Sequence, residues 1–260
     1  MRLAKLAISA GVATADTALA ATRRSRLRGG VTLLYHDIPL AYAPSFEQQL
    51  AMLARRHCVV SLAGLRARPL RGAVAITFDD AFASFVDVAV PRLARHGFPS
   101  TLFVPSALVD DDPQPFPYGP DGAAAPTLAT WAELAGLPSD LVTLGSHGRR
   151  HLDLRTLTDE ELDEELTGSR VEISSHTGHT VTLHAYPYGG FDARVQRAAG
   201  RAGYEAAVTV EPHLAHRHGG TGRVVVEPTD WPVEFRLKAA GAYRWMGWYM
   251  AAKRRLHAVS

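Results

Sequence analysis

The sequence predicts an α/β protein in which parallel strands alternate with helices, and two patterns carry this prediction. Short runs of apolar and β-branched residues, typical of buried strands, occur at residues 31–35, 73–78, 100–104, 141–145, 181–184 and 206–210. Between them, a Ser or Thr precedes Glu or Gln by three positions, the spacing of a helix-capping box, at residues 45–48, 130–133 and 158–161. No internal repeat is evident.

Further helices are expected between these strands. Apolar residues at helical spacing predict a helix from Phe82 that ends at Gly97, with a kink or split at Pro91. Another helix is expected over residues 192–202. Residues 110–127 are rich in Asp, Pro and Gly and predict a long surface loop, which often borders a binding site.

Composition describes a globular chain with an uneven distribution of charge. Its 260 residues are 47% hydrophobic and 21% charged, and the lone Cys58 excludes an internal disulfide or a thiolate metal cluster. Residues 1–30 and 232–260 each contain six Lys or Arg and one acidic residue, so both ends are basic and the middle is acidic. This distribution argues against a nucleic-acid-binding core, whereas the ends suit contact with an anionic membrane surface.

The chain therefore divides into a central body and two basic ends. Residues 1–29 form a basic segment in which an amphipathic helix is favoured over a cleaved signal peptide, and the segment is too polar to span a membrane. Residues 30–231 form the body. Residues 232–260 predict a basic, aromatic C-terminal helix, with a helical pattern over 235–256, that covers the barrel bottom or meets a membrane interface. A cytoplasmic or membrane-peripheral location is favoured over secretion.

Two carboxylates follow the apolar run at 73–78. Strand neighbours point to opposite faces, so Asp79 and Asp80 can serve different tasks at the strand end. Two adjacent ionised carboxylates resist burial unless one binds a cation or shares a proton. A helix N-cap is the alternative, but it explains one Asp better than two.

The sequence also places two imidazoles four residues apart, at His147 and His151. A helix or a tight loop can turn both toward one point, and two neutral imidazoles with one carboxylate suit Zn²⁺ or a similar divalent ion. Asp80 could supply the carboxylate, and surface or helix-capping histidines are the alternative. His36, the two Asp residues, His147 and Tyr188 all lie just past apolar strand runs, where barrels of this class carry their chemistry.

These residues resemble the motifs of the polysaccharide deacetylases of the NodB homology class, also called carbohydrate esterase family 4. Thr-Phe-Asp-Asp is present at 77–80 and His-Ser/Thr-x-x-His at 147–151, with Gly148 in the Ser/Thr position. The second half of Arg-x-Pro-Tyr-Gly is present at 185–189. The resemblance covers residues 30–227 and implies a distorted, incomplete (β/α)7-type barrel in a single domain with basic helical ends.

The resemblance implies a role for each matching residue. Asp80, His147 and His151 would bind one divalent metal, with Zn²⁺ favoured over Co²⁺ or Ni²⁺. Asp79 would be the general base that activates water, and the backbone N–H of Tyr188 would stabilise the oxyanion. The substrate would be an N-acetylated polysaccharide or oligosaccharide.

The proton for the leaving amine is expected from His36, which resembles the early Tyr-His element of a circularly permuted branch of the family. His216 in Leu-Ala-His is the less favoured candidate. It belongs with His213 and His218 to a cluster expected to be an exposed loop.

Two departures from the family pattern leave alternatives open. Ala185 stands where many members have an Arg that holds the catalytic Asp, and the sequence does not identify a substitute for that Arg. Residues 227–231 match the family's Asp-x-x-Asp-Trp motif only loosely. A catalytically degenerate member that binds metal and glycan within polysaccharide synthesis is therefore the alternative function. A glycoside hydrolase using Asp79 and Asp80 would leave the two histidines unexplained.

Overall fold

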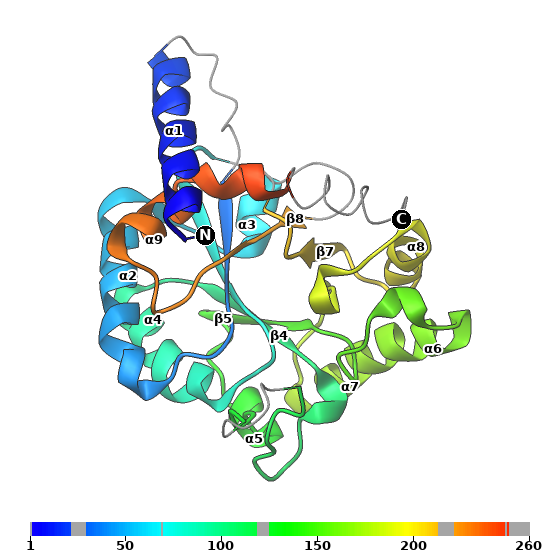
Figure 1. The fold of residues 1–260 in the computed structure, drawn as a ribbon. Coiled ribbons are helices and arrows are strands. Elements are labelled where there is room, and N and C mark those ends of the chain that lie inside the picture. The colour runs from blue at the N-terminus through cyan, green and yellow to red at the C-terminus, as the bar shows by residue number, and fades with distance from the viewer. Residues whose placement is uncertain are drawn as a thin grey trace.

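The computed structural model describes residues 2–21, 30–68, 70–118, 125–212, 221–247 and 249, and it confirms the predicted alternation of strands and helices (Figure 1). The strands are β1 (Val31–Tyr35), β2 (Cys58–Val59), β3 (Ala73–Phe78), β4 (Ser100–Val104), β5 (Val142–Ser146), β6 (Leu183–Ala185), β7 (Ala206–Thr209), β8 (Thr221–Gly222) and β9 (Val224–Val225). The α-helices are α1 (Arg2–Ala21), α2 (Ala43–Arg56), α3 (Leu62–Ala67), α4 (Val90–His96), α5 (Trp131–Ala135), α6 (Asp159–Asp163), α7 (Ser169–Thr177), α8 (Ala193–Arg201) and α9 (Pro232–Ala239).

The strands form a nearly closed parallel barrel, as expected. Neighbouring strands follow the order β8-β7-β6-β5-β4-β3-β1-β9, and β2 pairs with β3 outside this path. The two edge strands, β8 and β9, are separated in the chain only by Arg223, so the two edges of the sheet belong to one bent segment. This segment pairs with β7 through Thr221 and with β1 through Val224, which brings the barrel close to closure.

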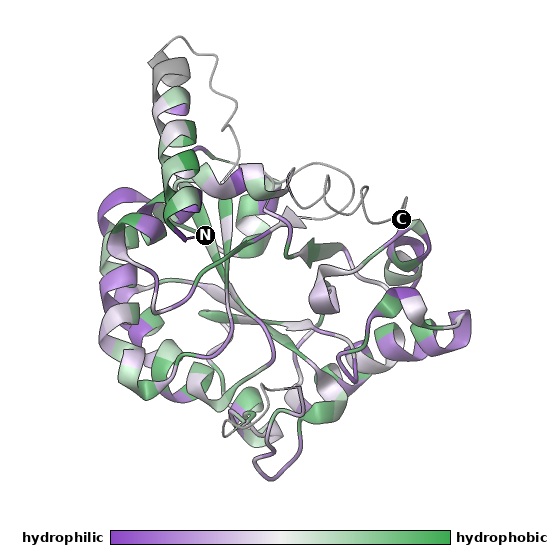
Figure 2. Ribbon diagram, in the orientation of Figure 1, coloured by the Kyte–Doolittle hydropathy of each residue, from purple (hydrophilic) through white to green (hydrophobic). Residues whose placement is uncertain are grey.

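The strands are largely apolar on both faces, which is the pattern of strands buried between a barrel interior and surrounding helices. All six residues of β3 and all five of β1 are buried. Figure 2 shows hydrophobic residues along the central strands and hydrophilic residues on outward surfaces of α2 and α6. The carboxyl ends of parallel strands share one rim, so residues that follow β1, β3, β5 and β6 come together there.

Two of the three predicted capping boxes are present, and one is wrong. Thr130 and Thr158 each accept a hydrogen bond from the third residue of α5 and α6, and the Glu there binds back to the cap. Ser45 does not cap α2, because that helix already begins at Ala43 with Pro44 in its first turn. Glu47 instead pairs with Arg95 on α4 at 2.8 Å.

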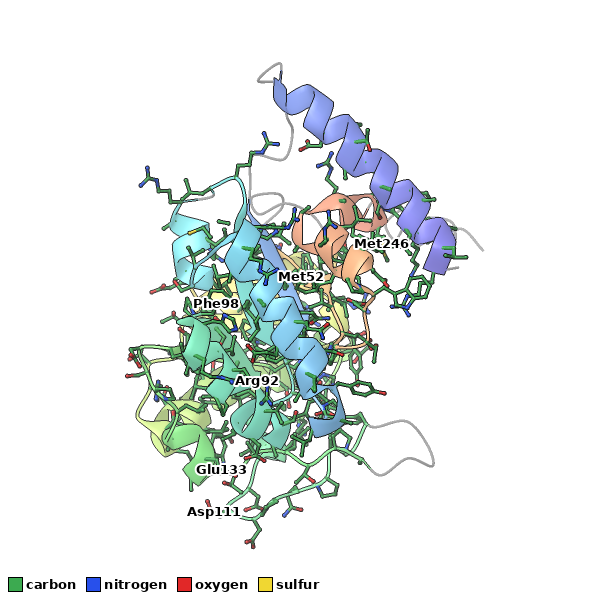
Figure 3. All side chains as sticks on the ribbon, turned by 90° about the vertical axis from the view of Figure 1, so that its left-hand side faces the viewer. Met52, Arg92, Phe98, Asp111, Glu133 and Met246 are labelled. Carbon is green, nitrogen blue, oxygen red and sulfur yellow. The ribbon has the colours of Figure 1, made fainter. Side chains whose placement is uncertain are left out.

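The helix that follows β3 is split near Pro91, as predicted. A π-helical turn, η2 (Phe85–Ala89), precedes α4, which ends at Gly97 in the left-handed conformation with φ 64°. A second π turn, η5 (Glu164–Gly168), joins α6 to α7. In the side view of Figure 3, Arg92 of α4 lies beside α2, and Asp111 and Glu133 lie at the end opposite α1.

The N-terminal segment is a helix, and one side of it packs beside α9. Arg2 donates to Glu234 at 2.7 Å and its guanidinium lies 4.5 Å from the centre of the Trp231 ring. Farther along α1, Trp245 donates its indole N–H to Ser9 at 2.9 Å. Within the described ranges, none of the helices combines the length and apolar composition needed to cross a bilayer.

The predicted C-terminal helix is interrupted within the described residues. α9 ends at Ala239, and Gly241 adopts a left-handed conformation with φ 75° that interrupts the helix. A short 3₁₀ turn, η7 (Ala242–Arg244), follows. Residues 250–260 lie outside the described part of the chain.

Candidate metal and catalytic site

The two carboxylates at the end of β3 diverge, as the alternation of strand side chains predicts. β3 ends at Phe78, and Asp79 and Asp80 are 2% and 5% exposed. Asp80 and the following Ala81 have positive φ values of 72° and 56°, which turn the chain sharply out of the strand. Asp79 consequently faces Arg223, whereas Asp80 faces the histidines.

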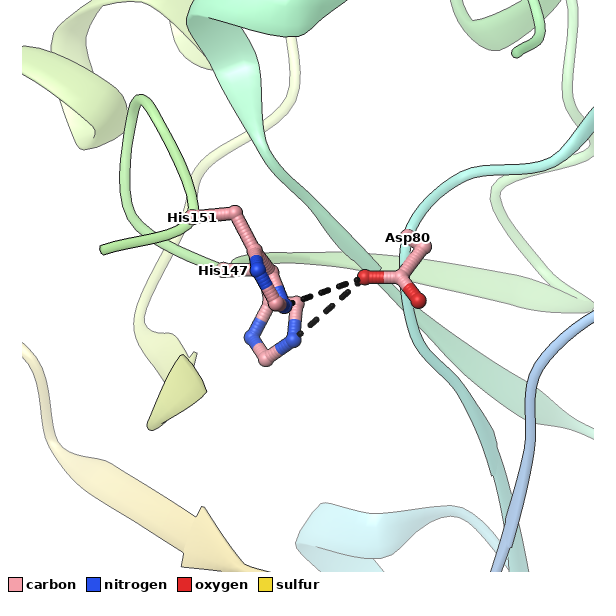
Figure 4. Close-up of side chains that lie close together, drawn as sticks. All are labelled: Asp80, His147 and His151. Atoms are coloured by element: carbon pink, nitrogen blue, oxygen red, sulfur yellow. Dashed lines mark ion pairs between the residues drawn. The ribbon is translucent and has the colours of Figure 1, made fainter. Parts of the chain in front are cut away.

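Asp80, His147 and His151 converge on one point, as predicted. Asp80 Oδ1 lies 3.6 Å from His147 Nε2 and 3.4 Å from His151 Nε2 (Figure 4). One potential ligand atom from each residue lies within 4.8 Å of the other two. Two ligand atoms about 2.1 Å from a tetrahedral Zn²⁺ stand roughly 3.4 Å apart, so these separations suit a divalent ion.

The chemistry of these three residues also fits a metal. Asp80 Oδ1 is buried and has no hydrogen-bond partner among the described residues. His147 binds the carbonyl oxygen of Ala185 through Nδ1 at 2.7 Å, so Nδ1 carries the proton and the lone pair of Nε2 faces Asp80. Burial, together with the charge of Asp79, raises the pKa of Asp80 to about 8 in the metal-free protein. A bound cation would relieve both penalties.

Both histidines are held neutral, as metal ligands must be. Burial lowers the pKa of His147, and burial with the neighbouring His147 lowers that of His151 to about 3. The His147–His151 segment is a loop rather than a helix. His151 adopts a positive φ of 57° there.

Backbone strain is concentrated at this site. Among the described residues, positive φ values outside glycine occur at Asp80, Ala81, His151 and Tyr188. Each of these residues lies in one of the three segments that follow β3, β5 and β6 at the barrel rim. Strain of this kind persists when the surrounding structure enforces it, and it is common in functional sites.

Arg223 holds Asp79, and the sequence had not identified it. Its guanidinium donates to Asp79 Oδ1 at 2.6 Å and to Oδ2 at 2.7 Å, a bidentate pair. Arg223 is 0% exposed and lies between β8 and β9. It therefore supplies the Arg–Asp contact that Ala185 cannot make. A single Arg in the run Thr-Gly-Arg-Val-Val-Val was the signal available in the sequence.

The ion pair fixes the charge of Asp79. Burial acts to raise the pKa of this carboxyl, but Arg223, with help from His147, outweighs it and lowers the pKa to about 2. Asp79 Oδ2 lies 3.6 Å from His147 Nε2. Asp79 is thus ionised beside the candidate metal position at every pH well above about 2.

His36 follows β1 on the same rim and is exposed. The loss of hydration on this crowded rim lowers the pKa of His36, while Asp79 acts to raise it. The structure therefore places His36 where the charges of Asp79 and Arg223 act on it. His213, His216 and His218 lie outside the described residues.

Aromatic rings surround His151 at the mouth of the site. The rings of Tyr188, Tyr118 and Phe116 have centroids 4.6, 5.6 and 5.7 Å from the His151 ring. Tyr188 and Tyr118 remain 58% and 47% exposed. Tyr118 lies in the long loop predicted to border a binding site, and its hydroxyl donates to the carbonyl of Arg150 at 2.9 Å.

Residues 227–231, which match the Asp-x-x-Asp-Trp motif only loosely, make structural contacts. Asp230 accepts two hydrogen bonds from Lys238 at 2.8 and 2.7 Å, and Trp231 lies under Arg2.

Comparisons with known proteins agree with this geometry. The family model described as polysaccharide deacetylase matches residues 66–207. YxkH of Bacillus subtilis (strain 168), whose name places it among the polysaccharide deacetylases, is 25% identical over 153 residues. That alignment covers 59% of this chain and 50% of YxkH, so the chain matches about half the length of that relative.

Two solved structures share the fold. The deacetylase PplD of Streptococcus pyogenes, solved in complex with acetate, has a TM-score of 0.64 at 20% identity, covering 81% of this chain and 98% of PplD. A de-N-acetylase from Aggregatibacter actinomycetemcomitans has a TM-score of 0.64 at 19% identity, covering 79% and 98%. The nearly closed parallel barrel is the fold of these solved deacetylases, and here it carries an Asp-His-His group that could hold a metal ion. This chain belongs to the polysaccharide deacetylase family.

Proposed function

We propose that this chain is a metal-dependent deacetylase that removes N-acetyl groups from an amino-sugar polysaccharide. One observation supports this most directly. A buried Asp80 oxygen, with no hydrogen-bond partner among the described residues, converges with two neutral imidazoles, and Asp79 lies beside them as a separately held carboxylate. A single divalent ion, with Zn²⁺ favoured over Co²⁺ or Ni²⁺, would supply Lewis acidity and lower the pKa of water toward about 7.

Asp79 is proposed as the base that receives a proton from the attacking water. With a pKa of about 2 it is permanently ionised near neutrality, and Arg223 fixes its orientation through both oxygens. A carboxylate this weak can serve as a base because the water it faces would itself be acidified. No Ser or Cys nucleophile is then needed.

Tyr188 and His36 are proposed to serve the two ends of the acetamide. Tyr188 has a φ of 57° in the turn after β6, and its backbone N–H would donate to the oxyanion. His36 in its protonated form, which the charge of Asp79 favours and the loss of hydration opposes, would give a proton to the leaving amine. The exposed ring faces of Tyr118 and Tyr188 suit contact with a sugar ring, which has apolar faces.

The choice of substrate draws on the fold neighbours. The Aggregatibacter protein is named a de-N-acetylase, and PplD was solved with acetate, the product expected here. Acetate release from poly-N-acetylglucosamine and chitin oligomers, measured with added Zn²⁺, Co²⁺ or Ni²⁺, tests the proposal. We expect release with the wild-type protein and a loss of at least about 10²-fold with Asp79→Asn. Equal rates for the two proteins would contradict the mechanism.

Metal analysis supplies an independent test of the site. The purified protein should hold one divalent ion, and His147→Ala should lose it, since two ligands of three would remain. A metal content unchanged by the substitution would contradict this ligand set. A glycan- and metal-binding member without turnover was the alternative, supported by Ala185. Arg223 makes the contact that Ala185 cannot, which removes the main argument for that alternative.

A further inference from the structure

The loop that carries both candidate histidine ligands is bound by a buried carboxylate from another element. The backbone N–H groups of Arg149 and Arg150 both donate to Glu165 Oε2, at 2.8 and 3.0 Å. The other oxygen, Oε1, accepts from the Arg150 side chain at 2.6 Å. Glu165 is 0% exposed, so its charge is buried, and its hydrogen bonds among the described residues go to this loop.

The carbonyl groups of the loop are satisfied as well. The Gly148 oxygen accepts from Ser169 Oγ at 2.9 Å and from the Ser106 N–H at 3.1 Å. The Arg149 oxygen accepts from the Ala107 N–H at 2.9 Å. Hydrogen bonds on both sides restrict the backbone of this irregular loop, and they therefore fix the positions from which its side chains extend.

The helical element that supplies these contacts is itself irregular. Glu165 lies in the π turn η5, and Ser169 begins α7 directly after it. A π turn inserted in a helix changes which side chains share a face, and such turns are frequent at functional sites. Here the turn presents Glu165 and Ser169 together to the loop. Gly168 allows the approach, because a Cβ there would lie 2.7 Å from Arg149 Cδ.

Gly148 and Glu165 fit one another. Gly148 has a φ of 74°, and a Cβ at this position would lie 3.2 Å from Glu165 Oε2. The family motif has Ser or Thr here, and either would be strained by the backbone and crowded by the carboxylate. Gly148 thus leaves room for the Glu165 carboxylate of η5 to bind the loop backbone.

We propose that Glu165 is a positioning residue that holds the 147–151 loop so that His147 and His151 face the metal before it binds. This inference rests on the metal site of the proposed function. Groups that orient metal ligands from outside the ligand set typically contribute 10- to 100-fold in metal affinity. Glu165 acts one step farther out, through the backbone that links the two ligands.

Zn²⁺ titration of the metal-free full chain against a competing chelator tests this, with no sugar present. Glu165→Ala should weaken Zn²⁺ binding about 10- to 100-fold, and Glu165→Gln, which keeps one acceptor oxygen and the volume, should recover part of the loss. Glu164→Gln is the matched neighbour, because Glu164 is exposed and contacts the Arg149 side chain rather than the loop backbone in the described residues. This variant should bind Zn²⁺ normally.

A second control separates positioning from a general loss of stability. Arg170 on α7 bonds the carbonyls of Val181 and Ala202, away from the loop, so Arg170→Ala should lower the melting temperature without changing Zn²⁺ affinity. The Glu165 variants should also lose amide-exchange protection at Arg149 and Arg150 in the metal-free state. Wild-type Zn²⁺ affinity in a folded Glu165→Gln and Glu165→Ala, or an equal loss in Arg170→Ala, would overturn the inference. A wild-type protein that binds no Zn²⁺ would instead overturn the metal site itself.

Discussion

Arg223 binds both carboxylate oxygens of Asp79, at 2.6 and 2.7 Å, across 144 residues of sequence. The guanidinium reaches Asp79 from the residue that joins β8 to β9, whereas the family motif would place an Arg at position 185, the last residue of β6. Arg223 also lies over the ring of Phe103, which shares a core cluster with Ala185. The same carboxylate is thus held from a different strand.

Replacing Arg223 should affect catalysis more than metal binding. Arg223→Ala leaves Asp79 buried and unpaired, so we expect about 3–5 kcal/mol of lost stability and a fall in kcat of about 10²-fold from misplacement. Arg223→Lys should recover little, because an ammonium cannot bind both oxygens in a fork. Steady-state kinetics and Zn²⁺ titration on the same samples check this. Unchanged kcat in Arg223→Ala would contradict the role given to the pair.

The position of the arginine can be exchanged in a double variant. Ala185→Arg combined with Arg223→Ala should restore part of the lost kcat, since Ala185 belongs to the same core cluster as Phe103, over whose ring Arg223 lies. Ala185→Arg alone should be destabilising, because it adds a buried charge beside an existing one. Activity of the double variant no higher than that of Arg223→Ala would show that position 185 cannot reach Asp79 in this chain.

The metal-free protein should lose stability as pH rises from about 6.5 to 8. Asp80 has a pKa of about 8 when folded against an ordinary value of 3.8, so in this range the folded state binds a proton that the unfolded state lacks. Stability then falls with pH by up to about 1.4 kcal/mol per unit. His151 acts oppositely, but only between about 3 and 6.5. Denaturant unfolding of the chelator-treated protein measures the slope, which Asp80→Asn should abolish. A slope that persists in that variant would contradict the assignment.

Tyr118 should contribute to substrate affinity rather than to chemistry. Its ring is exposed beside His151, and its hydroxyl anchors it to the metal-binding loop. Tyr118→Ala should raise KM about tenfold, the equivalent of roughly 1.4 kcal/mol of ring contact, with kcat nearly unchanged. Tyr118→Phe should have a KM close to that of the wild type. Tyr249 is an exposed tyrosine near the C-terminus, and Tyr249→Ala should have no effect. A fall in kcat without a change in KM would place Tyr118 in the chemistry instead.

We expect the outward side of α1 to contact an anionic membrane. Leu3 and Ile8 are 70% and 48% exposed there, and the terminal segments are basic. We expect the protein to sediment with vesicles of phosphatidylcholine and phosphatidylglycerol. Leu3→Glu with Ile8→Glu should reduce the bound fraction, whereas Val171→Glu, an exposed control on α7, should not. Equal binding by the double variant, or none by the wild type, would refute the contact.

Local patterns were sufficient to predict much of this structure. The Asp79–Asp80 pair and the His147–His151 spacing lie within single strand ends, so their convergence followed from the geometry of a parallel barrel. Arg223 and Glu165 could not be placed, because each acts through a contact with a distant segment and lies outside any motif. The C-terminal stretch was predicted as one helix because its apolar pattern continues past Gly241, where the left-handed backbone interrupts the helix. Ser45 failed as a cap because Pro44 favours an earlier helix start.

Because Arg223 lies between β8 and β9, Asp79 gains its counter-ion only when this segment has docked onto the barrel. Until residues 221–225 dock between β7 and β1, Asp79 has no counter-ion and an ionised carboxylate would oppose collapse of the barrel around it. Docking requires closing a loop of well over a hundred residues, which is slow because chain entropy must be lost first. A partly folded chain therefore has no Asp79 held in place by Arg223, and catalytic competence should emerge together with the last step of barrel assembly rather than gradually before it.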